Sequence, residues 1–363
     1  MIGKTMTAKA MIAMSGGVDS SVAAYLMKIR GCECTGVTMK LFSNEAVGVE
    51  DSACCSLKDA DDARSVAWRL EIPHYVFNFS GDFERQVIRR FVEAYGRGDT
   101  PNPCVDCNRY IKFERLFARA RLLEYDFIVT GHYARIEWDG EEGRFALKKA
   151  LDASKDQSYF LYSLTQEQMA HTLFPLGGLR KTEVREIARE QGFLNAQKRE
   201  SQDICFVPGG GYADFIERYT GEKARPGDFT DRAGRVLGRH KGRIRYTVGQ
   251  RKGLGIAFPR PMYVCGKNSA DGTVTLGGEE DLYSRALLAG DFNWIVRPPE
   301  APIRVAARTR YRQAERPATA ERLEDGSVRV EFDEPQRAVA TGQAVVLYDA
   351  DGIAGGGTII RVL

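Results

Sequence analysis

Two motifs carry side chains suited to catalysis, and the first is a glycine-rich loop at residues 15–20, SGGVDS. It follows the apolar run 11–14 and precedes a helical pattern over 22–29. Its glycines allow a tight turn whose N–H groups, with the positive end of the following helix, bind anions such as phosphate. Asp19 is a carboxylate of the kind that holds Mg²⁺ beside phosphates. The loop therefore predicts a phosphate site; the alternative is a plain strand-to-helix turn with Asp19 as a helix cap.

The loop differs from the two commonest nucleotide motifs. It lacks the lysine of GxxxxGK[ST] and does not match GxGxxG. The hydroxyls of Ser15, Ser20 and Ser21 add donors for an anion. The loop resembles that of enzymes that split ATP into AMP and pyrophosphate, which include asparagine, GMP, NAD and argininosuccinate synthetases and several tRNA-modifying enzymes. This resemblance implies ATP chemistry and leaves the acceptor open.

The second motif is the C-x-x-C of Cys104 and Cys107. The thiolate is the reactive form, so we expect Arg109 and Lys112 to lower the pKa of Cys107 and to speed its alkylation at neutral pH relative to Cys32 or Cys265. Half of a zinc site is the alternative, although no second C-x-x-C or spaced histidine pair accompanies it. The other close-set cysteines are expected to be buried free thiols: Cys32, Cys34, Cys54 and Cys55.

The elements that must position these motifs alternate between β and α over the first 150 residues. Apolar runs predict strands at 11–14, 34–42, 75–79 and 127–129, and helical patterns separate them at 22–29, 57–70, 83–95 and 111–123. Such alternation predicts an α/β fold with a mostly parallel, doubly wound sheet.

The character of the chain changes from about residue 209, where turn residues become frequent. Short alternating runs at 303–307, 328–332 and 344–348, with turns such as Asp325-Gly326, predict a small antiparallel β-barrel or sandwich. We therefore expect a catalytic ATP-binding domain over 1–208, a small central domain over 209–283 and a C-terminal β-barrel over 284–363.

Composition excludes several classes of protein. With 43% apolar and 28% charged residues, the 363-residue chain is typical of globular proteins rather than disordered or fibrous ones. No apolar run approaches the ~20 residues of a membrane span, and residues 1–10 lack a signal-peptide core, so we expect a cytoplasmic protein. Eight cysteines in such a chain favour catalysis or metal binding over disulfides. The net charge of +3 permits an anionic partner without requiring one.

Several sequence blocks together resemble the tRNA-specific 2-thiouridylases, over nearly the whole chain and in the same order. The blocks are PNPCVDCN (101–108) with IKF (111–113), TGHYA (130–134), KDQSYFL (155–161), 201–206 with Cys205, GQRKGLG (249–255), TRYR (309–312) and TGQ (341–343). The resemblance implies 2-thiolation of the wobble uridine of tRNA, with ATP and Mg²⁺. It implies that Cys107 is the nucleophile and Cys205 the persulfide carrier.

This chemistry has a simple physical basis. Oxide is a very poor leaving group, and adenylation of the C2 oxygen of uridine converts it into AMP, a good one. A cysteine persulfide can then deliver sulfur to that carbon, and a second cysteine can release it by forming a disulfide.

The resemblance also assigns binding residues. The positions that contact ATP would be Ala13, Met14, Ser15, Gly16, Gly17, Val18, Asp19, Ser20, Met39 and Gly131. Those that contact tRNA would be Asn102, Pro103 and Cys104 at the target base, and His132, Lys155, Asp156, Gln157, Tyr311, Arg312 and Gln343 elsewhere. Considered by itself, His132 is more typical of a structural histidine.

Three alternatives concern the sulfur step, the acceptor and whether the protein is an enzyme. Cys104, Cys107 and Cys205 could instead hold a [4Fe-4S] cluster with one iron open to sulfur, and the sequence does not decide between cluster and persulfide. An ATP-dependent synthetase with another acceptor would not need Cys107 and Cys205. A non-catalytic RNA-binding or cluster-carrying protein would release no pyrophosphate.

Two basic segments are candidates for holding RNA. Residues 235–252 contain seven Lys or Arg and no acid, and residues 304–316 include Arg308, Arg310 and Arg312 around Tyr311. Cations bind phosphates and an aromatic ring can stack on a splayed base, whereas a solvated basic face is the alternative. The family suggests the tRNAs for Lys, Glu and Gln, with a cysteine desulfurase or sulfur-relay protein as donor. A monomer is the default expectation.

Overall fold

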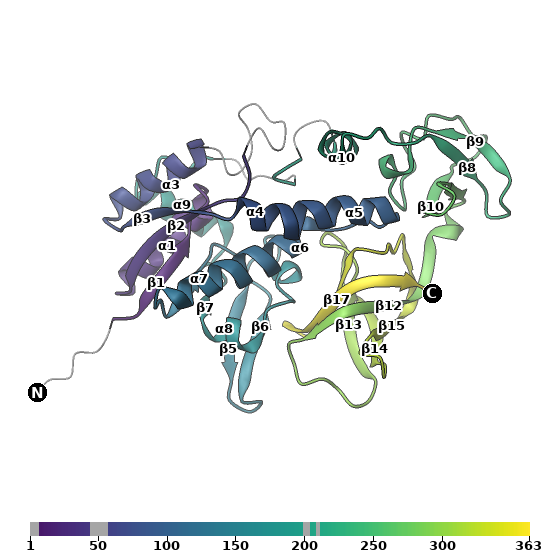
Figure 1. Ribbon diagram of the computed structural model, residues 1–363. Helices are drawn as coiled ribbons and strands as arrows, with labels where there is room; N and C mark the ends of the chain where they lie inside the picture. Colours follow the sequence, from purple (N-terminus) through teal and green to yellow (C-terminus); the bar gives the residue numbers. More distant parts are fainter. Residues whose placement is uncertain (1–6, 44–56, 199–203, 208–210) are drawn as a thin grey trace, which may run out of the picture. The chain divides into compact units, whose positions relative to one another are not determined.

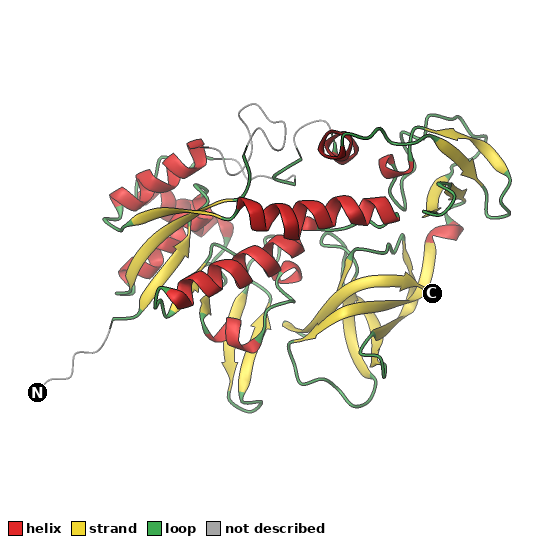
Figure 2. Cartoon of the chain, viewed as in Figure 1, coloured by secondary structure: helices red, strands yellow, loops and turns green. Residues whose placement is uncertain are grey.

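The computed structural model describes residues 7–43, 57–198, 204–207 and 211–363. The chain forms two compact units, each built from separate stretches of sequence. Unit 1 comprises Met1–Val87, Cys104–Pro208 and Ala350–Ile353; unit 2 comprises Ile88–Pro103, Gly209–Asp349 and Ala354–Leu363. Figure 1 labels the helices and strands, and Figure 2 separates them by type.

Unit 1 is an α/β structure. Its strands are β1 (Lys9–Ala13), β2 (Glu33–Lys40), β3 (His74–Asn78), β4 (Phe127–Val129), β5 (Arg135–Asp139), β6 (Arg144–Lys148) and β7 (Thr172–Leu173). Its helices are α1 (Val18–Ile29), α3 (Leu57–Arg69), α4 (Ser80–Phe83), η2 (Cys107–Leu116), α7 (Phe117–Leu122), η3 (Ser158–Phe160), α8 (Gln166–Ala170) and α9 (Lys181–Glu190). Two further helices, η1 (Glu84–Ile88) and α6 (Pro103–Asp106), each contain a boundary between the sequence of unit 1 and that of unit 2.

The main sheet of unit 1 has the order β3-β2-β1-β4-β7, and all its pairs are parallel. Ala10, Met11 and Ile12 of β1 are fully buried, as expected for a central strand covered on both faces. Helices α1, α3 and α9 share one apolar core with Ala10 and Ile12. The chain leaves β1 toward β2 on one side, while β4 lies on the other, which makes the carboxyl end of β1 a switch point where ligands bind in such sheets.

Unit 2 contains a small sheet and a barrel. It begins with helix α5 (Arg89–Arg97) and continues with α10 (Tyr212–Thr220), the short helices η4 (Arg243–Arg245) and η5 (Glu280–Leu282), and the strands of both sheets. The small sheet, in the order β10-β11-β8-β9, consists of β8 (Gly227–Thr230), β9 (Val236–His240), β10 (Tyr263–Lys267) and β11 (Val274–Gly277). Its core includes Phe229, Tyr246, Leu254 and Val264.

The barrel is antiparallel. Its strands are β12 (Tyr283–Trp294), β13 (Ile303–Arg308), β14 (Arg316–Arg322), β15 (Val328–Arg337), β16 (Ala344–Asp349) and β17 (Gly352–Val362). Pairing of β12 with β17 closes the sheet. In β15, buried Val328, Val330 and Phe332 alternate with exposed Arg329 and Glu331, which is the period of two that a barrel wall requires.

The predicted fold class is confirmed: a parallel α/β sheet, a small central β module and a C-terminal antiparallel barrel. Among the described residues, no helix combines the length and apolar character that a membrane span needs.

Candidate active site

The glycine-rich loop lies between β1 and α1, at the carboxyl end of β1. Gly17 is the N-cap of α1 and Asp19 lies in its first turn, so Asp19 is not the helix cap. The hydroxyls of Ser20 and Ser21 both donate to the carbonyl oxygen of Gly17, at 3.1 and 2.9 Å. Their single protons are therefore engaged within the loop, whereas Ser15 is exposed. The N-terminus of α1, with its positive dipole end, lies at this loop, where the sequence predicts an anion site.

The cation that the loop lacks comes from helix α9. The Nζ of Lys181 donates to both carboxylate oxygens of Asp19, at 2.7 and 2.8 Å. The hydroxyl of Tyr133 donates to Oδ1 of the same carboxylate at 2.8 Å, and Lys181 also lies over the Tyr133 ring. Lys181 is 162 residues from Asp19 in the sequence. The sequence offers little sign of a role for Lys181: only its position after β7, at the start of helix α9, is typical of a phosphate-binding residue.

A second set of side chains supports the loop from behind. The amide of Asn195 donates to the carbonyl of Gly16 at 3.0 Å and to the Ser21 hydroxyl at 2.9 Å. Lys198 donates to the same carbonyl at 3.3 Å and forms ion pairs with Asp59 and Asp62 of α3, at 2.6 and 2.7 Å. These contacts fix the conformation of the loop before any ligand binds.

Two other predicted ATP-binding positions lie on strands that flank β1. Met39 is near the end of β2, and Gly131 follows β4. A Cβ atom on Gly131 would lie 2.8 Å from the backbone of Asp19 and Ser20, so only glycine allows this approach. The predicted ATP positions are thus grouped around one edge of the sheet.

Cys107 is the first residue of η2, a helix with π-type hydrogen bonding, which is frequent at functional sites. Its neighbour Asn108 is buried, and its amide donates to the Phe160 carbonyl at 3.4 Å. One turn on, Lys112 bonds to Nε2 of His132 at 3.3 Å. The helix that carries Cys107 therefore contacts two of the predicted motifs, TGHYA and KDQSYFL.

His132 is buried and neutral. Burial, reinforced by the charge of Lys112, lowers the pKa of His132 well below its usual value. An ammonium group can only donate, so Nε2 accepts from Lys112 and the ring proton sits on Nδ1, which faces the Thr130 hydroxyl at 2.6 Å. These bonds give His132 a structural role; its contact with tRNA stays a prediction.

Cys205 lies in a segment that α4 anchors. Phe206 is buried and packs edge-on against Phe83 of α4, with ring centroids 5.7 Å apart. Helix α4 also contacts η2, where Arg115 forms an ion pair with Asp82 at 3.3 Å. The two cysteine-bearing segments thus dock on the same short helix. Neither Cys107 nor Cys205 forms a disulfide, and both side chains are half-buried.

The predicted lowering of the Cys107 pKa is wrong. Burial raises the pKa of Cys107 to about 11, helped by Cys104 and Asp106, and the opposing effect of Lys112 is smaller. Arg109, which was expected to lower this pKa as well, is not among the groups that shift it. Its guanidinium lies over the ring of Tyr110, 5.1 Å from the ring centroid. Desolvation of the thiolate outweighs the nearby cation, because η2 packs Cys107 among other groups.

We expect Cys107 of the ligand-free protein to alkylate no faster than Cys265, since burial raises the pKa of Cys265 to about 11 as well. At pH 7 only roughly one thiol in ten thousand is then ionised, and the rate should rise about tenfold per pH unit until the pH nears the pKa. Iodoacetamide labelling at pH 7 to 10, read by peptide mass spectrometry, measures both rates. A clearly faster Cys107 at pH 7 would contradict the raised pKa.

The cluster alternative for the cysteines finds no support. Among the described residues, which include Cys104, Cys107 and Cys205, no group of three or more Cys, His, Asp or Glu side chains is arranged to hold a metal ion. The predicted [4Fe-4S] site and the half zinc site are therefore not retained. Cys34 is buried, as predicted, but Cys32 is only half-buried, and Cys54 and Cys55 lie outside the described residues.

The KDQ motif makes internal contacts in unit 1. The buried carboxylate of Asp156 accepts from the Ala150 amide at 3.0 Å and the Ser158 hydroxyl at 2.8 Å. The side-chain oxygen of Gln157 accepts from the Tyr133 amide at 3.0 Å. The side chains of Asp156 and Gln157 thus hold the local backbone through hydrogen bonds. Contact of Lys155, Asp156 and Gln157 with tRNA stays a prediction.

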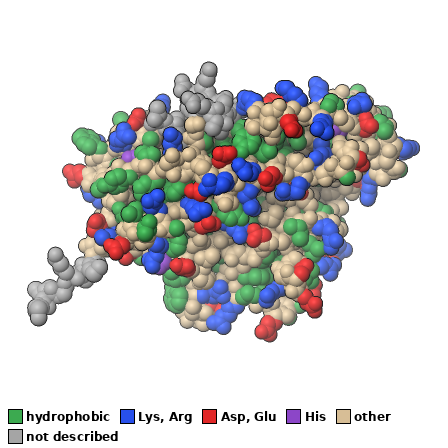
Figure 3. Space-filling model, viewed as in Figure 1, with side chains coloured by type: hydrophobic (Ala, Val, Ile, Leu, Met, Phe, Trp, Pro, Cys, Tyr) green, Lys and Arg blue, Asp and Glu red, His purple; other side chains and the backbone are tan. Residues whose placement is uncertain are grey.

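Several cations of the two basic segments form ion pairs within unit 2. Arg245 bonds to Asp214 and Glu217 at 2.9 and 2.6 Å, and Arg304 forms a bidentate pair with Asp333. The same holds for Arg235, Arg239 and Arg308, whose partners are Asp231, Asp228 and Glu315. Arg310 donates to two backbone carbonyls. On the face drawn in Figure 3, Lys and Arg side chains are accordingly interspersed with Asp and Glu.

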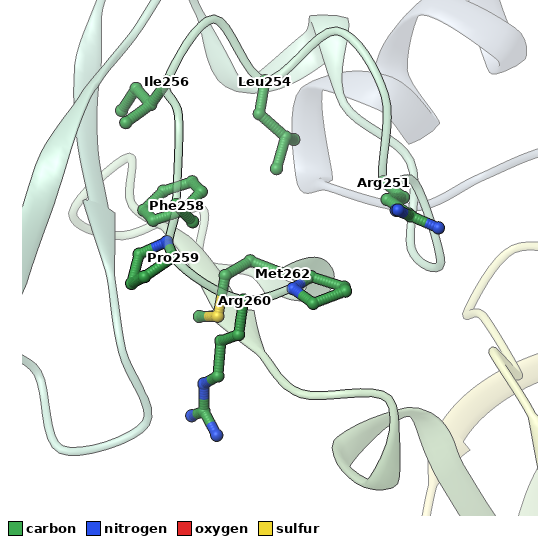
Figure 4. A pocket seen from close by; sticks show the side chains of 8 residues that line it. Arg251, Leu254, Ile256, Phe258, Pro259, Arg260 and Met262 are labelled. Atoms are coloured by element: carbon green, nitrogen blue, oxygen red, sulfur yellow. The ribbon is translucent and has the colours of Figure 1, made fainter.

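A smaller set of cations remains available to an anion. Arg251, Lys252, Arg260 and Arg312 are exposed, and none forms an ion pair with any residue the structure describes. Arg251 and Arg260 line an open cavity of about 300 Å³ in the small β module, together with Leu254, Ile256, Phe258, Pro259, Pro261 and Met262. In Figure 4, Arg251 lies across the cavity from Ile256.

Comparisons with known proteins agree with this arrangement. Family models match successive parts of the chain: the tRNA methyl transferase HUP domain at 8–209, the tRNA methyl transferase PRC-barrel domain at 213–278 and the aminomethyltransferase beta-barrel domain at 284–359. The chain is 53% identical to the tRNA-specific 2-thiouridylase MnmA of Moorella thermoacetica, with 97% of this chain and 99% of the relative covered. It is 47% identical to the protein of the same name from Clostridioides difficile, with 99% of each covered.

The chain belongs to the tRNA-specific 2-thiouridylase family. The resemblance seen in the sequence is confirmed, and with it the prediction that the chain is an enzyme of the sulfurtransferase class. In unit 1, the motifs shared with the 2-thiouridylases lie at the edge of the main sheet, on η2 and next to α4.

Proposed function

We propose that this protein uses ATP to replace the C2 oxygen of the wobble uridine of tRNA with sulfur, and that Cys205 carries the sulfur. One observation carries the proposal: a phosphate loop with an Asp19–Lys181 pair occurs in the same unit as two half-buried cysteines that form no disulfide and lie on segments that dock on one helix. A phosphate loop occurs in many enzymes without such cysteines, and cysteines occur without such a loop. Sulfur transfer to an adenylated acceptor needs both the loop and the cysteines.

In the first step, the loop amides and Lys181 hold the phosphates of ATP. The C2 oxygen of uridine attacks the α-phosphorus and pyrophosphate leaves. Asp19 is about 30% exposed and is a carboxylate, so it can reach Mg²⁺ bound to the phosphates; the ion neutralises phosphate charge when bound. Without nucleotide, the positive charge of Lys181 pairs with the Asp19 carboxylate. When ATP binds, Lys181 contacts its phosphates.

In the second step, the terminal sulfur of a Cys205 persulfide attacks C2 and AMP leaves. The Cys107 thiol then loses its proton to solvent and, as thiolate, attacks the Cys205 sulfur, which breaks the S–S bond and leaves the sulfur on uridine. The product is a Cys107–Cys205 disulfide, which a dithiol reductant returns to two thiols. A cysteine desulfurase or relay protein supplies the persulfide sulfur.

The substrate RNA would contact the unpaired cations of unit 2. Arg251 and Arg260 line the same cavity as the aromatic ring of Phe258, so phosphates and a stacked base could bind there together. Arg312 lies in the TRYR motif that the family resemblance assigns to tRNA. The tRNAs for Lys, Glu and Gln are the proposed substrates.

The test combines purified protein, an unmodified transcript of one of these tRNAs, ATP, Mg²⁺, a cysteine desulfurase with cysteine as the persulfide source and a dithiol reductant, followed by mass spectrometry of the nucleosides. We expect 2-thiouridine, with AMP and pyrophosphate formed in equal amounts. Pyrophosphate release that does not depend on tRNA would favour a synthetase with another acceptor. Absence of any sulfur gain would overturn the proposal.

A further inference from the structure

A turn of the barrel holds the chain segment that leads into the cysteine motif. Residues 341–343 lie between β15 and β16, and they bond to Asp99 and Thr100, which follow α5 in the same unit. The Thr100 amide donates to the Thr341 carbonyl at 2.8 Å, and the Thr341 hydroxyl donates to the Asp99 carboxylate at 2.7 Å. The Gln343 side-chain amide donates to the Thr100 carbonyl at 2.6 Å. Two backbone groups and one carboxylate of the segment are thus bound to one turn.

The opposite side of the segment is held as well. The Asp99 amide donates to the Ala94 carbonyl at 2.9 Å, and the Asp99 carbonyl accepts from Lys267 of β10 at 3.1 Å. Asp99 and Thr100 therefore have their backbone polar groups bonded on both sides. Cys104 and Cys107 follow Thr100 after only four and seven residues. A chain this short transmits a displacement of Thr100 to the residues that follow it.

Gly342 shows how closely the two segments approach. Its φ of +82° is one that residues with a side chain rarely adopt. A Cβ atom there would lie 2.8 Å from the Cβ of Asp99 and 3.0 Å from the Thr100 amide nitrogen. Each residue of the TGQ motif therefore has a function in this contact: Thr341 and Gln343 form the hydrogen bonds, and Gly342 leaves room for the close approach.

We propose that Thr341 and Gln343 are positioning residues, which fix the segment 99–103 and thereby the start of the Cys104–Cys107 motif. This inference rests on the proposed function and assigns Gln343 a role other than the tRNA contact that the family resemblance implies. The two roles predict different kinetics. A positioning residue changes the rate of sulfur transfer within the bound complex, whereas an RNA contact changes the affinity for tRNA.

The experiment compares Thr341→Val, which keeps the shape and removes the hydroxyl, with Thr341→Ser, which keeps the hydroxyl. Gln343→Ala is the third variant. For Thr341→Val and Gln343→Ala we expect single-turnover thiolation to slow about tenfold, as expected from the loss of one hydrogen bond, with the Kd for tRNA within about twofold of wild type. Thr341→Ser should restore the wild-type rate. Thermal unfolding of each variant checks that it is folded.

A second readout does not depend on activity. Hydrogen exchange of the peptide that contains residues 98–104 should be slow in the wild type and faster in Thr341→Val and Gln343→Ala, but not in Thr341→Ser. A raised Kd for tRNA with an unchanged rate in Gln343→Ala would overturn the positioning role, as would unchanged exchange in both variants. If the wild type makes no 2-thiouridine, the proposed function fails, and the exchange data still decide whether this turn holds the segment.

Discussion

A Cys205→Ser variant is expected to make no measurable 2-thiouridine while it still releases pyrophosphate in the presence of tRNA. Serine keeps the size of cysteine but cannot form a persulfide, so activation of uridine proceeds and sulfur transfer does not. We expect the loss of thiolation to exceed about 10³-fold, as is typical when a covalent catalyst is removed. Nucleoside mass spectrometry and a pyrophosphate assay on the same sample separate the two steps.

Cys107→Ser is expected to be equally inactive in turnover, because the sulfur could not be released by disulfide formation. Cys265→Ser is the matched control: Cys265 is also a partly exposed free thiol with a pKa near 11, but it lies in the small β module of unit 2. It should retain wild-type thiolation. A Cys107→Ser, Cys205→Ser double variant that thiolates at the full rate would refute the persulfide relay.

Lys181→Met is expected to reduce tRNA-dependent pyrophosphate release about 10²-fold. Methionine keeps the length of the side chain and removes the charge that pairs with Asp19 and would face the phosphates. The loss of one preorganised charged donor has an effect of this size in other phosphoryl- and acyl-transfer sites. Pyrophosphate release at saturating tRNA, measured over a range of ATP concentrations, gives both kcat and KM.

The controls for Lys181 address charge and stability. Lys181→Arg keeps the charge and should recover part of the rate. Lys148→Met removes another ion-paired lysine of unit 1, whose partner is Glu137 at 2.9 Å, and should leave the rate unchanged. Asp19→Asn combined with Lys181→Met should be little worse than the single variants, since the two side chains act as a pair. Fully additive losses would show that they act independently.

The fold was largely predictable because the motifs of unit 1 lie in regular β/α units. The predicted strand at 127–129 coincides with β4, and the predicted helix at 57–70 differs from α3 by one residue. Apolar periodicity determines such elements locally. The sequence did not predict that helix α5 belongs to the second unit, because the pattern of a helix does not reveal what packs against it.

The candidate site was predictable in part. The phosphate loop and the cysteines are contiguous motifs, and their residue types indicate the chemistry directly. The basic segments were misleading, since Arg245 and Arg304 look available in the sequence but are neutralised by acids that lie well away in the chain. Charge counts along a sequence do not include these partners.

The sequence by itself determined the class of reaction: a loop for phosphate, two thiols for sulfur and a family whose motifs occur in order along the chain. The tertiary structure alone decided how these groups are tuned. It brings Lys181 to Asp19 across 162 residues, raises the pKa of Cys107 by burial and directs Gln343 to the Thr100 carbonyl. The reason is physical: a side chain's identity is local, whereas its partners, its solvation and hence its pKa depend on which distant segments pack around it.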